Sequence, residues 1–114
     1  SAYPWGAAYA AAKAGMLALT RTTAAESARR GVRANAICPG PVTETRMSQE
    51  LGIAIGARLG LTPEAELAQF LESILQGRGL TAAEIAAAAA FLASDQASAI
   101  TGQSLNVDGG AVFC

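Results

Sequence analysis

The sequence predicts an α/β protein. Stretches with the composition of helices alternate with two short runs typical of strands, in the order helix, strand, helix, helix, strand. Each strand candidate is followed by a turn signal, Pro-Gly-Pro after the first and Asp-Gly-Gly after the second. A complete parallel sheet needs more strands than these two. We therefore expect the 114 residues to be part of a larger sheet whose N-terminal half lies outside the chain.

The first element is expected to be a long helix over residues 9–30. The stretch consists of good helix formers, contains no proline, and has Gly15 as its only interior glycine. Gly31 follows Arg29 and Arg30, which is the composition of a helix C-terminus. Small and apolar residues recur at helical spacing on one face, which would let another helix approach closely: Ala8, Ala12, Gly15, Met16 and Leu19.

A strand is expected next, over residues 32–38, and the Pro-Gly-Pro turn ends it. Residues 42–61 show no clean periodicity, so they are interpreted as a mobile segment with partial helix. Thr62 has the properties of an N-cap, with Pro63 in the first turn, and starts a helix that should run to about residue 75.

The last helix and strand are signalled by local motifs. Thr81 and Glu84 fit a capping box, which predicts a helix from there to about Ala93. Residues 104–107 alternate polar and apolar side chains as a strand does, and the Asp108 turn ends them.

Composition excludes several classes of function. A hydrophobic content of 52% suits a globular unit, whereas a net charge of −1 without a basic stripe argues against a nucleic-acid partner. Charged and polar residues interrupt every apolar run before it reaches the length of a membrane span, so no membrane partner is expected. The first five residues lack the basic start and apolar core of a signal peptide.

Histidine and cysteine usage narrows the chemistry further. The absence of histidine removes Ser-His-Asp and Cys-His catalysis and histidine-based zinc sites. Cys38 and Cys114 show no metal-ligand spacing, so no metal is expected, and Cys38 is interpreted as a small buried hydrophobe in the first strand. A reduced, cytoplasmic protein is the simplest account.

One pair of residues suggests catalysis. Tyr9 and Lys13 are four positions apart, so in a helix they lie on one face. A nearby positive charge favours the phenolate form of a tyrosine, which would let the phenol exchange protons at ordinary pH. Taken alone, a Tyr-x-x-x-Lys spacing arises by chance in many chains.

Further motifs accompany this pair, and together they resemble the short-chain dehydrogenase/reductase family over nearly the whole chain. The catalytic Tyr-x-x-x-Lys helix is matched by Tyr9-Ala10-Ala11-Ala12-Lys13-Ala14-Gly15, and the strand with its nicotinamide loop by residues 32–42. The C-terminal signature is matched by Phe91-Leu92-Ala93-Ser94-Asp95, Ile100-Thr101-Gly102-Gln103 and Val107-Asp108-Gly109-Gly110. Gly77-Arg78 with Glu84-Ile85-Ala86 resembles the segment before that signature. The resemblance implies the C-terminal part of a Rossmann-type doubly wound parallel sheet.

The resemblance also implies roles for individual residues. Tyr9 would be the general acid/base, and Lys13 would favour its ionised form and hydrogen-bond the nicotinamide ribose. The loop formed by Pro39, Gly40, Pro41 and Val42, called the 39–42 loop below, would lie against the nicotinamide of NAD or NADP. The family places a threonine two residues after the valine. Glu44 stands there in this chain, so either Thr43 or Thr45 takes that role.

Other polar and aromatic residues have simpler interpretations. Asn35 is expected to tie down backbone beside the strand, and Asp108 to cap a turn. Tyr3 and Trp5 precede the catalytic tyrosine, where pocket lining and ordinary packing are equally open.

Two hypotheses of function follow. In the first, the protein is an NAD(P)-dependent oxidoreductase that interconverts a small-molecule secondary alcohol and a ketone; it forms a homodimer or homotetramer, and this chain alone is inactive. In the second, the chain is a non-catalytic module derived from the same family that only binds or associates. The Gly-rich loop and the family's catalytic serine and asparagine are not found in the sequence.

Overall fold

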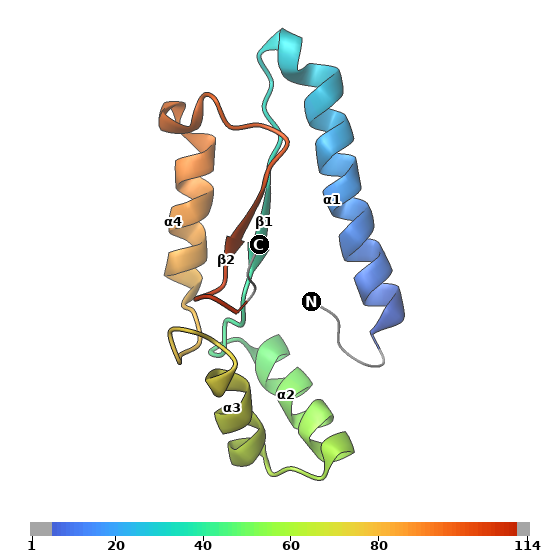
Figure 1. The fold of residues 1–114 in the computed structure, drawn as a ribbon, viewed down its shortest axis with the longest axis vertical. Coiled ribbons are helices and arrows are strands. Elements are labelled where there is room, and N and C mark those ends of the chain that lie inside the picture. Colours follow the sequence, from blue (N-terminus) through green and yellow to red (C-terminus); the bar gives the residue numbers. More distant parts are fainter. Residues whose placement is uncertain (1–5, 112–114) are drawn as a thin grey trace. The chain divides into compact units, whose positions relative to one another are not determined.

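A computed structural model describes residues 6–111, except for the side chain of Ser48. Its elements follow the predicted order, with one additional helix and two short 3₁₀ turns (Figure 1). They are α1 (Ala7–Ser27), η1 (Ala28–Arg30), β1 (Ala36–Pro39), α2 (Arg46–Leu59), α3 (Pro63–Glu72), α4 (Ala82–Ala93), η2 (Asp95–Ala97) and β2 (Ser104–Val107).

The two strands pair side by side in parallel, which confirms the predicted fold class. The amide of Ala36 donates to the carbonyl of Gln103, and the amide of Gly40 donates to the carbonyl of Val107, both at 2.8 Å. Both strands advance in the same sense, and the connection between them contains helices, as parallel neighbours require. β1 is shorter than the predicted strand because its first residues are still loop.

Described residues fall into two compact units. The first contains α1, residues up to Cys38, and Ala88–Leu105. Its buried side chains are Ala24, Leu92 and Ala97. Ala24 is the only buried residue of α1. α1 and η1 confirm the predicted helix over residues 9–30, and Gly31 ends it with a left-handed φ of 78°.

The second unit contains Pro39–Ala87 and the described residues from Asn106 onward. Ile74 and Leu80 are its buried hydrophobic residues. The N-cap prediction is confirmed, because the Thr62 hydroxyl accepts from the Ala65 amide at 3.2 Å and Pro63 opens α3. α3 ends at Glu72, earlier than expected, because Ser73 and Ile74 bond back to carbonyls only three residues away.

The expectation for residues 42–61 was wrong in part, because α2 is a regular helix of 14 residues. α2 packs against α3, and two of its glycines lie against Glu66 of that helix. A Cβ at Gly52 would lie 2.9 Å from Glu66 Oε2, and a Cβ at Gly56 would lie 3.2 Å from Glu66 Cβ. Glycines on the packed side of the helix remove the apolar period on which sequence analysis depends.

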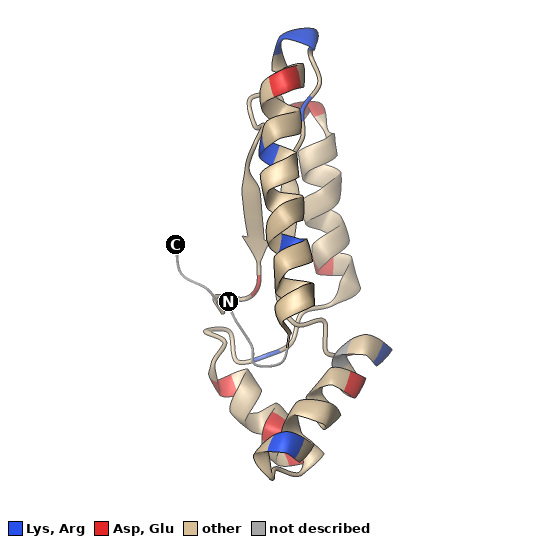
Figure 2. Ribbon diagram, turned by 90° about the vertical axis from the view of Figure 1, so that its right-hand side faces the viewer, with Lys and Arg blue, Asp and Glu red and all other residues tan. Residues whose placement is uncertain are grey.

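Charged residues lie mostly singly along the described helices (Figure 2). The adjacent Arg29 and Arg30, in the last turn of η1, form the basic doublet of the chain. They complement the partial negative charge of a helix C-terminus. No helix in residues 6–111 is long and apolar enough to cross a membrane.

Candidate active site

α1 places Tyr9 and Lys13 one turn apart on the same face. The Lys13 Nζ atom lies 5.4 Å from the centre of the Tyr9 ring, and the Tyr9 side chain is 50% exposed. This separation is within the range of a cation–π contact. The predicted neighbourhood of phenol and ammonium is therefore present, while their catalytic roles stay a prediction.

The 39–42 loop begins at the end of β1 and is held in a narrow space. Gly40 donates its amide to Val107, and a Cβ at Gly40 would lie 2.7 Å from the Asp108 Cα and 2.9 Å from Leu80 Cδ1. The Pro41 carbonyl accepts from the Leu80 amide at 2.8 Å. Only glycine fits this close approach, and the loop is fixed by backbone contacts on both sides.

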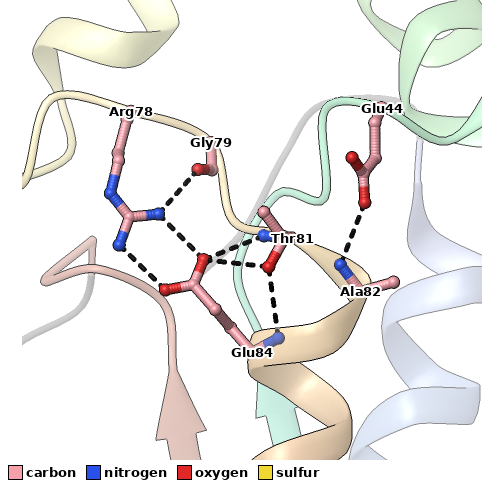
Figure 3. Close-up of polar contacts among 6 residues, drawn as sticks. All are labelled: Glu44, Arg78, Gly79, Thr81, Ala82 and Glu84. Atoms are coloured by element: carbon pink, nitrogen blue, oxygen red, sulfur yellow. Dashed lines mark hydrogen bonds and ion pairs between the residues drawn. The ribbon is translucent and has the colours of Figure 1, made fainter.

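The three residues after the loop have different environments. Thr43 packs onto Gly79, where an added Cβ would overlap the threonine hydroxyl. Thr45 donates its hydroxyl to the Val42 carbonyl at 2.9 Å. The Glu44 side chain points to the start of α4, where its Oε1 accepts from the Ala82 amide at 3.0 Å (Figure 3). The choice between Thr43 and Thr45 as the nicotinamide contact stays open.

The amino end of α4 carries a cluster of polar contacts (Figure 3). The Thr81 amide donates to Glu84 Oε1 at 3.0 Å, and the Glu84 amide donates to the Thr81 hydroxyl at 3.2 Å. These reciprocal bonds are the predicted capping box.

The Glu84 carboxylate also forms a bidentate pair with Arg78, whose Nη1 and Nη2 atoms each lie 2.8 Å from a carboxylate oxygen. This hydrogen-bonded pair, with help from the Thr81 amide, lowers the pKa of Glu84 to about 2. The same pair raises the pKa of Arg78. The pairing of these two residues was not predicted from the sequence, although they lie only six positions apart.

Arg33 binds the carboxyl end of α4, and this contact was also not predicted from the sequence. Its guanidinium donates to the carbonyls of Leu92 at 2.8 Å, Ser94 at 3.2 Å and Ile100 at 3.4 Å. The positive charge lies where the last carbonyls of a helix lack partners. An arginine at the start of a strand was the available signal, but nothing in the sequence indicates its distant acceptors.

Asn35 and Asp108 have the structural roles expected of them. Asn35 donates to the Ile100 carbonyl at 2.9 Å and accepts from the Gln103 amide at 3.1 Å. The Asp108 carboxylate accepts from the Gly110 amide at 3.0 Å, which closes the turn after β2. Both observations confirm the interpretation from the sequence.

Cys38 requires a correction. It is a free cysteine of intermediate exposure rather than a buried one, because the side chains of β1 point to the faces of the sheet, and these are only partly covered in the described residues. Tyr3, Trp5 and Cys114 lie outside the described residues. No group of three or more acidic or cysteine residues within residues 6–111 is arranged to hold a metal ion.

Comparisons with known proteins identify the class of protein. The family model described as enoyl-(acyl carrier protein) reductase matches residues 1–112. Together with the relatives below, this match shows that the chain belongs to the short-chain dehydrogenase/reductase family.

Two curated relatives illustrate the range of named activities. The chain is 44% identical to a probable 2,4-dienoyl-CoA reductase of Bacillus subtilis over 95% of its own length and 41% of the relative's. It is 47% identical to 2-(S)-hydroxypropyl-CoM dehydrogenase 3 of Xanthobacter autotrophicus, over 94% of the chain and 40% of the relative. The chain thus spans about two fifths of the length of these relatives.

Solved structures of the family have the same fold. A variant of the actinorhodin polyketide ketoreductase, solved with NADPH, matches with a TM-score of 0.90 at 32% identity. The match covers 97% of this chain and 42% of the ketoreductase. The elements described above are therefore those of a Rossmann-type fold.

Proposed function

We propose that this chain is the C-terminal part of an NAD(P)-dependent oxidoreductase that interconverts a secondary alcohol and a ketone. The observation that carries the proposal is the Lys13 ammonium 5.4 Å from the Tyr9 ring, with the phenol half exposed on α1. A phenol in this setting can act as a general acid and base, provided that it is accessible to a substrate. Tyr9 gives its proton to the ketone oxygen during reduction and takes it from the alcohol during oxidation.

The residues present fit the nicotinamide end of the cofactor. The 39–42 loop, whose backbone is fixed by Gly40, offers a rigid surface for the nicotinamide, and either Thr43 or Thr45 adds a hydroxyl beside it. Lys13 carries the donors that a ribose hydroxyl accepts from. NAD(P), when bound, supplies or accepts the hydride.

The pyrophosphate end of the cofactor requires residues that this chain does not contain. Pyrophosphate recognition in this fold uses a Gly-rich turn between a strand and a helix, and no such sequence occurs in residues 1–114. Since relatives are about two and a half times longer, we place the dinucleotide-binding half upstream of Ser1. The chain alone is then inactive.

The test is an assay of the full-length protein with NADH and NADPH against a panel of ketones, and with the oxidised cofactors against secondary alcohols. We expect turnover with at least one cofactor. Residues 1–114 alone, titrated with NADH and NADPH by nicotinamide fluorescence, should show no saturable binding in the low micromolar range. Cofactor binding by the full-length protein without turnover on any substrate would instead favour the non-catalytic module.

The exposed face of α1 supports a homo-oligomer, either a dimer or a tetramer. Met16 and Leu19 are largely exposed, and nothing lies within 4 Å of a Cβ built at Gly15. A face of this composition suits close contact with a second helix. Sedimentation of the full-length protein as a monomer at micromolar concentration would contradict this. The free thiol of Cys38 suits a reducing, cytoplasmic compartment.

A further inference from the structure

Glu44 joins two segments that are distant in the sequence. Its carboxylate lies 38 residues from the Ala82 amide that donates to it. Residue 44 follows the 39–42 loop, and Ala82 is the first residue of α4. α2 and α3 both lie between these two positions in the sequence. The Glu44–Ala82 contact therefore joins the two ends of the segment that contains both helices.

Two further contacts join the same two segments of the chain, beside the Glu44–Ala82 hydrogen bond. The Leu80 amide donates to the Pro41 carbonyl at 2.8 Å, and Thr43 packs onto Gly79. Residues 41, 43 and 44 therefore meet residues 80, 79 and 82. We call this set of three contacts the seam.

Glu44 is the only contact of the seam made by an ionisable side chain. Ala82 begins a helix, so its amide has no partner within α4, and a carboxylate there also complements the positive end of the helix dipole. Thr81 already accepts from the Glu84 amide, which leaves the Ala82 amide for an acceptor outside the helix. A threonine at position 44, two bonds shorter than glutamate, would not extend as far.

We propose that Glu44 is a positioning residue that fastens the 39–42 loop to the start of α4 and thereby fixes the loop for nicotinamide binding. The role in cofactor binding rests on the proposed function, whereas the tether itself does not. Glu44 fixes the position of the loop and does not itself contact the cofactor.

The experiment compares three variants of the full-length protein. Glu44→Ala removes the acceptor, Glu44→Gln keeps an oxygen that can accept from Ala82, and Glu50→Ala is the matched control. Glu50 also lies on exposed surface, but its ion pair is with Arg46, one turn away in α2.

Hydrogen–deuterium exchange tests the tether without any assay of activity. In Glu44→Ala, the peptide spanning residues 79–84 should exchange about 10-fold faster than in wild type, because the Ala82 amide loses its acceptor. Glu44→Gln should restore most of the protection, and Glu50→Ala should leave it unchanged. Unchanged exchange in Glu44→Ala overturns the proposal, whatever the kinetics.

Steady-state kinetics tests positioning. Glu44→Ala should raise the KM for the cofactor about 10-fold and change kcat less than threefold, and Glu44→Gln should remain within threefold of wild type in both. Faster exchange with an unchanged cofactor KM overturns the positioning role. If wild type itself shows no turnover, the proposed function fails, and the exchange measurement still decides whether the tether exists.

Discussion

α1 and α4 are both rich in alanine, but they are held in different ways. α1 has 21 residues, its N-cap Gly6 makes no side-chain hydrogen bond, and one of its residues is buried. α4 has 12 residues and side chains from other segments bound at both ends, Glu44 at the start and Arg33 at the finish. A long alanine-rich helix depends mainly on propensity and length, whereas a short one needs partners.

The two helices therefore differ in their expected roles: α1 carries the candidate catalytic pair, whereas α4 is stabilised by side chains from other segments. The candidate catalytic pair lies on α1, where a substitution removes a functional group and few contacts. Arg33, at the end of α4, makes three hydrogen bonds to backbone carbonyls and has no proposed role in the chemistry. Substitutions of Tyr9 and Lys13 should therefore change activity more than stability, and substitution of Arg33 at the end of α4 should do the reverse.

The largest effect is expected for Tyr9→Phe in the full-length protein. The change removes the phenolic proton and keeps the ring, so kcat should fall about 10²–10⁴-fold while cofactor affinity stays close to wild type. Initial rates and a cofactor titration measure the two quantities. A variant that keeps more than about a tenth of the wild-type kcat contradicts the assignment of Tyr9.

A second effect on α1 is expected for Lys13→Met. Loss of the ammonium should weaken cofactor binding and shift the pH–rate profile of alcohol oxidation to higher pH, because one side chain serves both the ribose and the phenolate. Arg21→Met, a change of another cation on α1, is the control and should alter neither. An unchanged profile in Lys13→Met would show that this lysine does not act on Tyr9.

Stability should respond most at the far end of α4. Arg33→Met leaves three carbonyls without a charged donor, so the free energy of unfolding should fall by about 1.5–3 kcal/mol. The control is Arg46→Met, because Arg46 is highly exposed and its ion pair with Glu50 lies within one helix. Its effect should be below about 1 kcal/mol. Urea unfolding of the full-length variants measures both values, and equal losses would contradict the role given to Arg33.

The smallest effect is expected for the loss of stability at acidic pH that arises from Glu84. The folded pKa of Glu84 is about 2, below its ordinary value of 4.5, so the folded state favours the ionised carboxylate. The stability from this group is complete above pH 4.5 and is lost as the pH falls from there toward 2. Unfolding measured across this range should depend less on pH in Glu84→Gln than in wild type. Glu50→Gln is the control, and a slope reduced equally in both variants would contradict a special role for Glu84.

Local features could be predicted from the sequence where the residues that determine them are close together in the chain. The capping box at Thr81 and the N-cap at Thr62 each depend on residues three positions away, and the turn at Gly31 depends on backbone freedom at one position. The shared face of Tyr9 and Lys13 follows from helical periodicity alone.

Side-chain contacts could not be predicted from the sequence where the partner residue is distant in the chain. Arg33 binds a carbonyl 59 residues away and Glu44 binds an amide 38 residues away, and no local pattern specifies either acceptor. α2 was expected only as partial helix, because the glycines at 52 and 56 carry no hydrophobic signal although they lie against α3.

The guanidinium of Arg33 also determines where the chain tolerates a change of length. It binds carbonyls on both sides of the segment between residues 94 and 100, so adding or deleting a single residue there would move one acceptor away from the others. The turn between α2 and α3 is bonded to the end of α2, through the Gly60 and Leu61 amides, and not to a distant segment in the described structure; nothing lies within 4 Å of a Cβ built at Gly60. A tag or reporter loop is therefore better inserted at residue 60 than anywhere between the end of α4 and β2.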